Sequence, residues 1–600
     1  MKNVKWIILF SIIGLFLLTV SLQSFANCTS FVVGKDASAD GSTFVTIQQD
    51  TRSYDPRLSV IPAADHESGS MRPCPDMPQY QRWYDEYGNP RDATQISVAY
   101  DRHEPLPEGA QVEIFEIPQV EHTYGYLAGL FTTMNEHQVS FGMATLSCPD
   151  VLWNDEGVLR VTQLSYIAAE RATTAREAIQ IMGEMAEKYG LRSEYTPGKG
   201  FGISDGEEAW VFHIMQSGFD WTPESGKPGA IWAAKRVPDD EVAVYPNGEV
   251  LDEIDFNDPE NYMWSDNVKS YAEEMGWWDP EWDRPFNFQH AYLQGEHNPE
   301  GTRMRLWRAF SLLAPSLDLP TPDEQLYMED KYGGPWRYPF SVKPDKPVTV
   351  EDLKTWTRDR LEGTPYDMTK GPLAGPFGAP TRTMRGASTT IDGKRVRGSI
   401  RAIESDSSQY SEICQSRSWL PDHIGGIVWW TAGRPKTAFR VPFYCGVTEI
   451  PECHATGSHY EFEWGKTAYW AATFVNTFAH VMWNHIIEDV KDMQNEIESE
   501  AIAMIPAIDA RAVELYEENP DKADEFLTNF CSMFARDATE RYWDFAEYLI
   551  LKYHHRYINI PKVAQSPEMN DPEYWQQQAL EYQEEVRGRT QEELQGKMIK

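Results

Sequence analysis

Cys28 is the residue of this sequence with the clearest chemical potential, because it lies two residues beyond the predicted cleavage site of a secretory leader. The leader has a basic start, an apolar run over residues 6–20, and small residues, Ser24 and Ala26, at the −3 and −1 positions of the site. The run is shorter than the ~20 residues of a membrane-spanning helix. We therefore expect residues 1–26 to be a signal peptide, and the mature protein to be periplasmic or secreted, without stable membrane association.

A cysteine at this position has three interpretations. It is a half-cystine, as exported proteins favour disulfides; a lipoprotein anchor, although such sites want a small residue where this chain has Asn27; or an N-terminal nucleophile. In the third case, removal of Asn27 gives Cys28 an α-amine with a pKa of ~8, which can take the thiol proton and return it. The last two interpretations exclude each other, since an acylated amine cannot act as a base.

The residues after Cys28 predict an apolar strand, a turn at Asp40 and Gly41, and a second strand. This stretch resembles the N-terminus of the cysteine dipeptidases of the dipeptidase A type, which are N-terminal-nucleophile hydrolases. Further motifs of that family follow in the same order, at residues 62–66, 134–140, 174–178, 362–369 and 416–421. The resemblance implies an α+β fold, an αββα sandwich, and a peptide hydrolase that forms an acyl-Cys28 intermediate without cofactor or metal.

Two polar residues match family positions that face the nucleophile. Asn247, in a Val-Tyr-Pro-Asn-Gly segment, matches an asparagine that follows a strand and would donate to the oxyanion. Its alternative is a turn residue, because Pro-Asn-Gly favours turns. Thr145 matches a second polar position, and its alternative is an ordinary strand threonine.

Two charged residues complete the predicted site. Asp50 matches the acid that relatives keep near the α-amine, where a carboxylate orients the amine and holds it charged. Relatives often carry Arg or Lys three residues earlier, but here that position is Ile47. Arg305 is the candidate that supplies the missing cation and lowers the thiol pKa; its alternative is a structural arginine. Asn135 is predicted to cap a turn between two strands.

The composition fits a large enzyme with an acidic surface. The 600 residues include 21 Trp and carry a formal net charge of −38, which opposes binding to nucleic acid and anionic lipid and leaves small peptides as the expected partners. Oligomers remain compatible with the sequence. Of the six other cysteines, Cys445 and Cys453 are closest; with His454 and His459 they match no regular zinc spacing, so we expect a local disulfide or free thiols.

The chain divides by pattern into four parts after residue 27. Residues 28–345 form the core of the predicted sandwich, with strands at 44–49 and 139–146 and helical periodicity over 161–189. Residues 346–465 continue the peptidase domain with turns and strands, including 425–431 and 437–444. Residues 466–555 are helical, with candidates at 466–500, 501–518 and 521–553, and 556–600 form a polar tail.

Competing functions remain at this point. The G-x-S-x-G motif at 202–206 is that of a serine nucleophile elbow, but the alternating residues after it predict a hairpin turn at Asp205 and Gly206 instead. An amidase acting on a penicillin or a bile-acid amide would use the same Cys28 chemistry. An exported binding lipoprotein anchored at Cys28 and a non-catalytic disulfide protein are the alternatives from other classes.

Overall fold

The computed structural model describes residues 28–50, 56–76, 113–292, 299–331, 334–371, 374–380, 388–391, 394–397, 400–457, 462–559 and 573–598. The predicted signal peptide and Asn27 lie outside the described residues. All five predicted site residues lie inside them.

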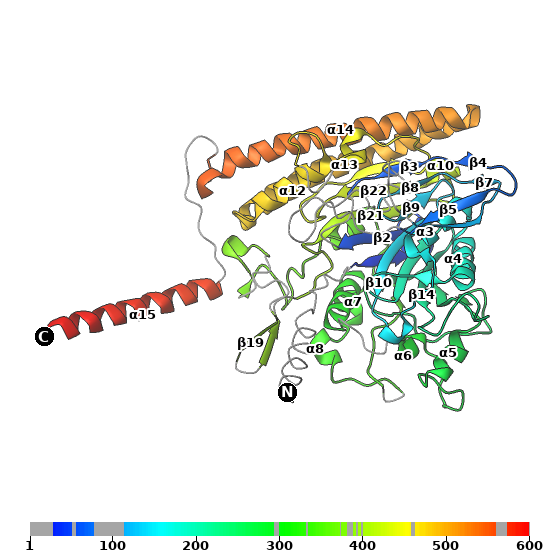
Figure 1. The fold of residues 1–600 in the computed structure, drawn as a ribbon. Helices are drawn as coiled ribbons and strands as arrows, with labels where there is room; N and C mark the ends of the chain where they lie inside the picture. The colour runs from blue at the N-terminus through cyan, green and yellow to red at the C-terminus, as the bar shows by residue number, and fades with distance from the viewer. Residues whose placement is uncertain are drawn as a thin grey trace, which may run out of the picture.

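Two sheets form the centre of the molecule (Figure 1). The first has seven strands in the order β18-β16-β1-β2-β21-β22-β23. Its strands are β1 (Ser30–Val33), β2 (Thr43–Asp50), β16 (Val242–Tyr245), β18 (Ser341–Val342), β21 (Ser408–Ser416), β22 (Ile427–Ala432) and β23 (Val441–Tyr444).

The second sheet has eight strands in the order β17-β15-β14-β13-β10-β9-β8-β3. Its strands are β3 (Ser59–Ile61), β8 (Tyr126–Ala128), β9 (Thr132–Asn135), β10 (Ser140–Leu146), β13 (Gly198–Ser204), β14 (Ala209–Gln216), β15 (Ala230–Arg236) and β17 (Tyr262–Trp264). Two-stranded pairs lie outside both sheets: β4 (Ala64–Asp65) with β7 (His122–Thr123), β5 (Met71–Pro75) with β6 (Ile114–Pro118), β11 (Leu159–Arg160) with β12 (Leu191–Arg192), and β19 (Ser388–Ile391) with β20 (Lys394–Arg397).

The two sheets pack face to face, and glycine brings them close together. Gly142 of β10 pairs with Gly202 of β13. A Cβ at Gly142 would lie 2.8 Å from Val45 Cγ1, and a Cβ at Gly202 would lie 2.7 Å from Val32 Cγ2. Both valines belong to the facing sheet, so the backbones of β10 and β13 lie directly against the side chains of β1 and β2.

Helices cover the outer faces of both sheets. α3 (Val161–Arg171) and α4 (Ala175–Tyr189) pack on the eight-stranded sheet. α12 (Ala468–Ala479), α13 (Trp483–Glu518) and α14 (Pro520–Tyr553) pack on the seven-stranded sheet (Figure 1). The order of layers is therefore helices, sheet, sheet, helices, and the predicted α+β class is confirmed.

The remaining helices connect or flank these layers. They are α5 (Val268–Glu274), α6 (Phe288–Tyr292), α7 (Pro299–Leu313), α8 (Pro322–Gln325), α9 (Val350–Trp356), α10 (Asp422–Gly425), α11 (Glu452–Ala455) and α15 (Glu573–Met598). α15 extends away from the body in Figure 1, and Trp575 near its start donates a hydrogen bond to the carbonyl of Ala374. Within the described ranges, no helix is long and apolar enough to cross a membrane.

Several predicted elements have different boundaries in the structure. The helical stretch 161–189 is two helices, because Thr174 caps α4 by accepting from Glu177 N. The predicted break after residue 500 is wrong: α13 continues through it, and the break falls at 480–482, between α12 and α13. The strand predicted over 437–444 begins at Val441, because the N–H groups of Thr437 and Ala438 bond back to the carbonyl of Arg434 in a turn.

Other local predictions are confirmed. β1 and β2 form the antiparallel pair expected from the first motif. β13 and β14 are joined by a hairpin whose turn contains Asp205 and Gly206, so the 202–206 motif does not lead into a helix. Asn135 caps the turn between β9 and β10 by accepting from the N–H groups of His137 and Val139.

Gly202→Ala should lower the free energy of unfolding by about 1–3 kcal/mol, because the added methyl overpacks against Val32. Chemical denaturation measures this loss. The control is the double variant Gly202→Ala/Val32→Ala, in which the shortened valine makes room. Its loss should be smaller than the sum of the two single losses, and strict additivity would contradict close packing of the sheets at this point.

Candidate active site

Cys28 lies two residues before the start of β1, next to the centre of the seven-stranded sheet. The residue is buried, and its sulfur is a free thiol. Its Sγ is 3.5 Å from Oε1 of Gln49, a residue of the adjacent strand β2. The pairing of β1 with β2 therefore places the thiol beside the end of β2, where Asp50 is also located.

The second sheet contacts this site through backbone carbonyls of β10. These carbonyls lie beyond Ser140, the residue at the start of β10 where β9 pairs with it. Further along β10, two carbonyl oxygens accept hydrogen bonds from side-chain amides: Gln49 Nε2 donates to Met143 O at 3.2 Å, and Asn247 Nδ2 donates to Thr145 O at 2.8 Å. The site thus lies where the two sheets are joined by the amides of Gln49 and Asn247.

The amide group of Asn247 is held from both ends. Its Nδ2 donates to Thr145 O, and its Oδ1 accepts from Arg305 Nη2 at 2.9 Å. Its backbone carbonyl also accepts from the N–H of Ser147 at 2.7 Å. Asn247 is therefore more than a turn residue, since two partners fix the plane and the orientation of its side chain.

Arg305 links the backbone of Cys28 to Asn247. It projects from α7 and is fully buried. Besides Asn247, its guanidinium donates to the carbonyl of Cys28 and to Thr29 Oγ1, the latter at 3.0 Å. The structure places the predicted cation beside Cys28, where it contacts the backbone and Asn247.

Asp50 is buried and is paired with Arg401. Arg401 Nη2 and the hydroxyl of Ser408 donate to its two carboxylate oxygens. Arg401 also donates to the carbonyls of Ala402 and Ile403. Burial raises the pKa of Asp50 to about 6, although Arg401 and Ser408 both lower it.

Sequence reasoning missed three of these residues. Arg401 is 351 positions from Asp50, and no local pattern connects them. Ser408 begins β21, whose pairing with β2 brings it to Asp50. Gln49 precedes Asp50 directly, and the two consecutive glutamines near the end of this buried strand were the available signal for a polar residue near the site. Ile47 is buried, and the cations of the site come from α7 and from residue 401 instead of β2.

Thr145 reaches the site with its backbone. Its carbonyl accepts from Asn247, while its buried hydroxyl has no hydrogen-bond partner among the described residues. Across the β10–β13 pair it lies opposite Lys199, a fully buried lysine whose Nζ donates to Ser193 Oγ at 2.9 Å. Burial lowers the pKa of Lys199 to about 8.

The thiol of Cys28 is in its protonated form in this environment. Burial, together with the negative charge of Asp50, raises its pKa to about 12. A hydrogen bond from the backbone of Asp50 and the charges of Arg401 and Arg305 oppose this effect without overcoming it. A group that accepts the proton is therefore needed before the sulfur can attack a carbonyl carbon.

The other cysteines do not form disulfides in the structure. Cys28 and the other six, including Cys445 and Cys453, are free thiols. Within the described part of the chain, His, Cys, Asp and Glu side chains form no group of three or more that is placed to hold a metal ion.

Comparison with known proteins assigns the chain to a family. Residues 27–74 and 107–496 match the model of peptidase family C69. The chain therefore belongs to peptidase family C69, which confirms the resemblance seen in its motifs. It is a peptide hydrolase of the cysteine type.

Three relatives illustrate the likeness. A probable dipeptidase of Latilactobacillus sakei is 26% identical over 443 residues, which cover 71% of this chain and 76% of the relative. A probable dipeptidase A of Streptococcus pyogenes serotype M18 is 25% identical over 516 residues, with coverages of 83% and 92%. A probable dipeptidase B of S. pyogenes serotype M1 is 23% identical over 475 residues, with coverages of 76% and 79%.

Arg401→Gln should lower the free energy of unfolding by about 3–5 kcal/mol near pH 7.5, because it leaves the charge of Asp50 buried and unpaired. The folded-state pKa of Asp50, about 6, lies above the unfolded value of ~3.9, so stability falls as the pH rises between these values. Without Arg401 the folded-state pKa rises further and this window extends upward. The loss measured by denaturation should therefore be larger near pH 7.5 than near pH 5.

The control for this prediction is Asp50→Asn/Arg401→Gln, which removes both charges. It should be more stable than Arg401→Gln alone near pH 7.5. A loss in Arg401→Gln that does not change with pH would contradict the pairing.

Proposed function

We propose that this protein is an exported dipeptidase whose nucleophile is Cys28, made N-terminal by maturation, in an αββα sandwich of the N-terminal-nucleophile hydrolase type. The observation that carries the proposal is the position of Cys28 just ahead of β1, near the Asp50–Arg401 pair and the Asn247–Arg305 pair. The helix–sheet–sheet–helix layers and the relatives named as probable dipeptidases support it.

The need for a base supports the N-terminal mechanism. The thiol pKa of about 12 requires a proton acceptor, and Gln49 and Arg305, which contact Cys28, cannot accept a proton at neutral pH. Removal of residues 1–27 would create an α-amine on Cys28 itself. An amine with a pKa of ~8 takes a proton readily near neutrality, and the Asp50 carboxylate nearby would orient it.

The reaction then proceeds in two halves. The amine takes the thiol proton, and the sulfur forms a bond to the carbonyl carbon of the peptide. Asn247 Nδ2 and a backbone amide stabilise the oxyanion. The ammonium gives its proton to the leaving nitrogen, so the C–N bond breaks and a thioester remains on Cys28. Water, deprotonated by the same amine, attacks the thioester and releases the acid while the thiol is restored.

The contacts of Asn247 suit it to this role. Arg305 binds Oδ1, and the carbonyl of Thr145 binds Nδ2, so the amide cannot rotate and its N–H groups keep a defined direction. Preorganised donors of this kind stabilise charge without having to reorient during the reaction. Arg305 is in this scheme a residue that orients Asn247 and the Cys28 backbone, and the chemistry requires neither metal nor cofactor.

We expect the mature, active protein to begin at Cys28. Cleavage after Ala26 leaves Asn27 on the proposed base, so a second cut, by self-processing or by an aminopeptidase, must follow. Intact-mass measurement and N-terminal sequencing of exported protein check this. Fully active protein that retains Asn27, or a lipid on Cys28, would falsify the amine-base mechanism. The control, Cys28→Ala, should hydrolyse no dipeptide while its Tm stays nearly unchanged, because Cys28 forms no disulfide.

Asn247→Ala should lower kcat on a dipeptide by roughly 10²- to 10³-fold with little change in KM, if Asn247 donates mainly to the transition-state charge. Steady-state kinetics normalised to folded active sites measures this. Asn247→Asp is the matched variant: it keeps Oδ1 for Arg305 but lacks the N–H donor. We expect it to be as slow as Asn247→Ala, and near-normal kcat in Asn247→Asp would assign Asn247 the role of holding Arg305.

A further inference from the structure

We infer that two adjacent residues, Asp359 and Arg360, are positioning residues that hold the two sides of the Cys28 site at a fixed separation. They contact neither Cys28 nor Asp50 directly. Asp359 acts on the side of Arg305 and Asn247, and Arg360 acts on the side of Asp50 and Arg401. The inference rests on the proposed function, because it concerns the groups that act in that reaction.

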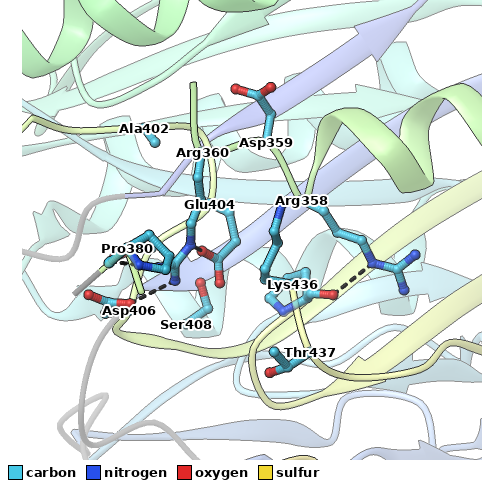
Figure 2. Close-up of polar contacts among 12 residues, drawn as sticks. Arg358, Asp359, Arg360, Pro380, Ala402, Glu404, Asp406, Ser408, Lys436 and Thr437 are labelled. Atoms are coloured by element: carbon cyan, nitrogen blue, oxygen red, sulfur yellow. Dashed lines mark hydrogen bonds and ion pairs between the residues drawn. The ribbon is translucent and has the colours of Figure 1, made fainter. Parts of the chain in front are cut away.

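The two side chains extend in opposite directions from one short segment after α9. Figure 2 shows the guanidinium of Arg360 directed toward Glu404 and Asp406, whereas the carboxylate of Asp359 is directed away from them. Both residues are buried. Each of them therefore reaches a different part of the structure from nearly the same point of the backbone.

Asp359 anchors α7. Its two carboxylate oxygens accept from Nε and Nη2 of Arg308, at 2.9 and 2.5 Å. Arg308 follows Arg305 by three positions, which places both on neighbouring parts of one helix face. Because Arg305 binds the Cys28 carbonyl and Asn247 Oδ1, the Asp359–Arg308 pair fixes the helix turn from which these contacts are made.

Arg360 anchors the segment that holds Asp50. Its Nε donates to Glu404, its Nη2 to Asp406 Oδ1 at 2.7 Å, and its Nη1 to the carbonyl of Pro380 at 3.2 Å. Glu404 and Asp406 lie between Arg401 and Ser408, the two residues whose side chains bind the carboxylate of Asp50. Arg360 thus binds the middle of the segment whose ends hold Asp50.

Hydrogen bonds hold the backbone around these two adjacent residues. Leu361 has φ of +69°, a left-handed conformation that side chains other than glycine rarely adopt and that persists where the surroundings fix it. Here two hydrogen bonds fix the conformation. Leu361 N donates to Asp359 Oδ1 at 2.8 Å, and Arg360 N donates to Glu362 Oε2 at 2.7 Å. Glu404 N also donates to Asp359 O at 3.0 Å, which joins the two anchored segments.

This arrangement predicts different kinetic effects for the two residues. Burial and the charge of Glu404 raise the pKa of Asp50, whereas Arg401, Ser408 and, most weakly, Arg305 lower it. The amine, with a pKa of ~8, sets the first step of the acid limb of kcat/KM, and Asp50 sets a second step at lower pH because its carboxylate orients the amine only when ionised. When the segment from 401 to 408 loosens, the pKa of Asp50 rises, and this second step moves to higher pH. When α7 loosens instead, Asn247 loses its fixed orientation, and kcat falls without a comparable shift of the limb.

The test compares Arg360→Lys with Arg358→Lys, the same change two residues away. Arg358 is equally well bonded, to Glu498 of α13 and to the carbonyls of Pro435 and Ala438, but none of these partners contacts Asp50 or Cys28. Lysine keeps the charge and loses the fork that binds two partners. Both variants should lose stability, so a structural effect alone cannot separate them.

We expect Arg360→Lys to move the second, Asp50-dependent step of the acid limb of kcat/KM upward by roughly one pH unit, as weakened contact with an opposite charge does, while Arg358→Lys keeps the wild-type profile. Asp359→Asn should lower kcat by up to about 100-fold with the limb in place. The inference is overturned when Arg360→Lys and Arg358→Lys share one pH profile, or when Asp359→Asn retains wild-type kcat.

A second measurement separates this inference from the proposed function. The rate of Cys28 alkylation by iodoacetamide as a function of pH, on the mature protein, reports the thiol environment without any peptide substrate. Wild type that hydrolyses no dipeptide contradicts the proposed function. Alkylation profiles that are the same in Arg360→Lys and Arg358→Lys contradict the inference, whatever the hydrolysis assay gives.

Discussion

Asp50 and Arg401 are both buried, and each makes the charge of the other tolerable. Removing an ion from water costs several kcal/mol in a protein interior, and only a well-oriented opposite charge with further hydrogen bonds offsets that cost. Arg401 supplies the charge, and Ser408 supplies the additional donor. Because Asp50 ends β2 and Arg401 lies just before β21, this pair also fixes the segment that leads into a central strand of the seven-stranded sheet.

The same constraint explains why arginines recur around Cys28 in a chain of net charge −38. A guanidinium offers five donors in a plane and can serve several acceptors at once. Arg305 uses this to join the backbone carbonyl of Cys28 to the side-chain oxygen of Asn247. Arg360 uses it to join the carboxylates of Glu404 and Asp406.

The thiol environment is coherent with a nucleophile that depends on its own amine. Burial and the charge of Asp50 raise the thiol pKa, the nearby cations lower it, and the net value is about 12. The sulfur is therefore not a thiolate at neutral pH. In the mechanism proposed above, reactivity therefore begins when the peptide bond before Cys28 is cut, because that step adds the missing proton acceptor without altering the sheets around it.

The sequence by itself determined the features that depend on local pattern. Buried alternation predicted β2 and β10, the turn at Asp205 and Gly206 followed from residue types that favour hairpins, and the motifs identified the family. Neighbouring residues decide such features, because strand periodicity and turn chemistry act over a few positions. Cys28, Asp50, Asn247 and Thr145 came from positions that match the family, and Arg305 was predicted as a substitute for the cation missing at Ile47. The structure places all five around one junction between the two sheets.

Only the tertiary structure decided which partners these residues have. Arg401 meets Asp50 because β21 pairs with β2, and Arg305 meets Asn247 because α7 packs beside β16. The sequence has no strong helix stop near residue 500, and α13 runs through that point. The break between α12 and α13 falls at 480–482 instead. Long-range ion pairs depend on strand order and burial, and neither quantity is written in the spacing of residues along the chain.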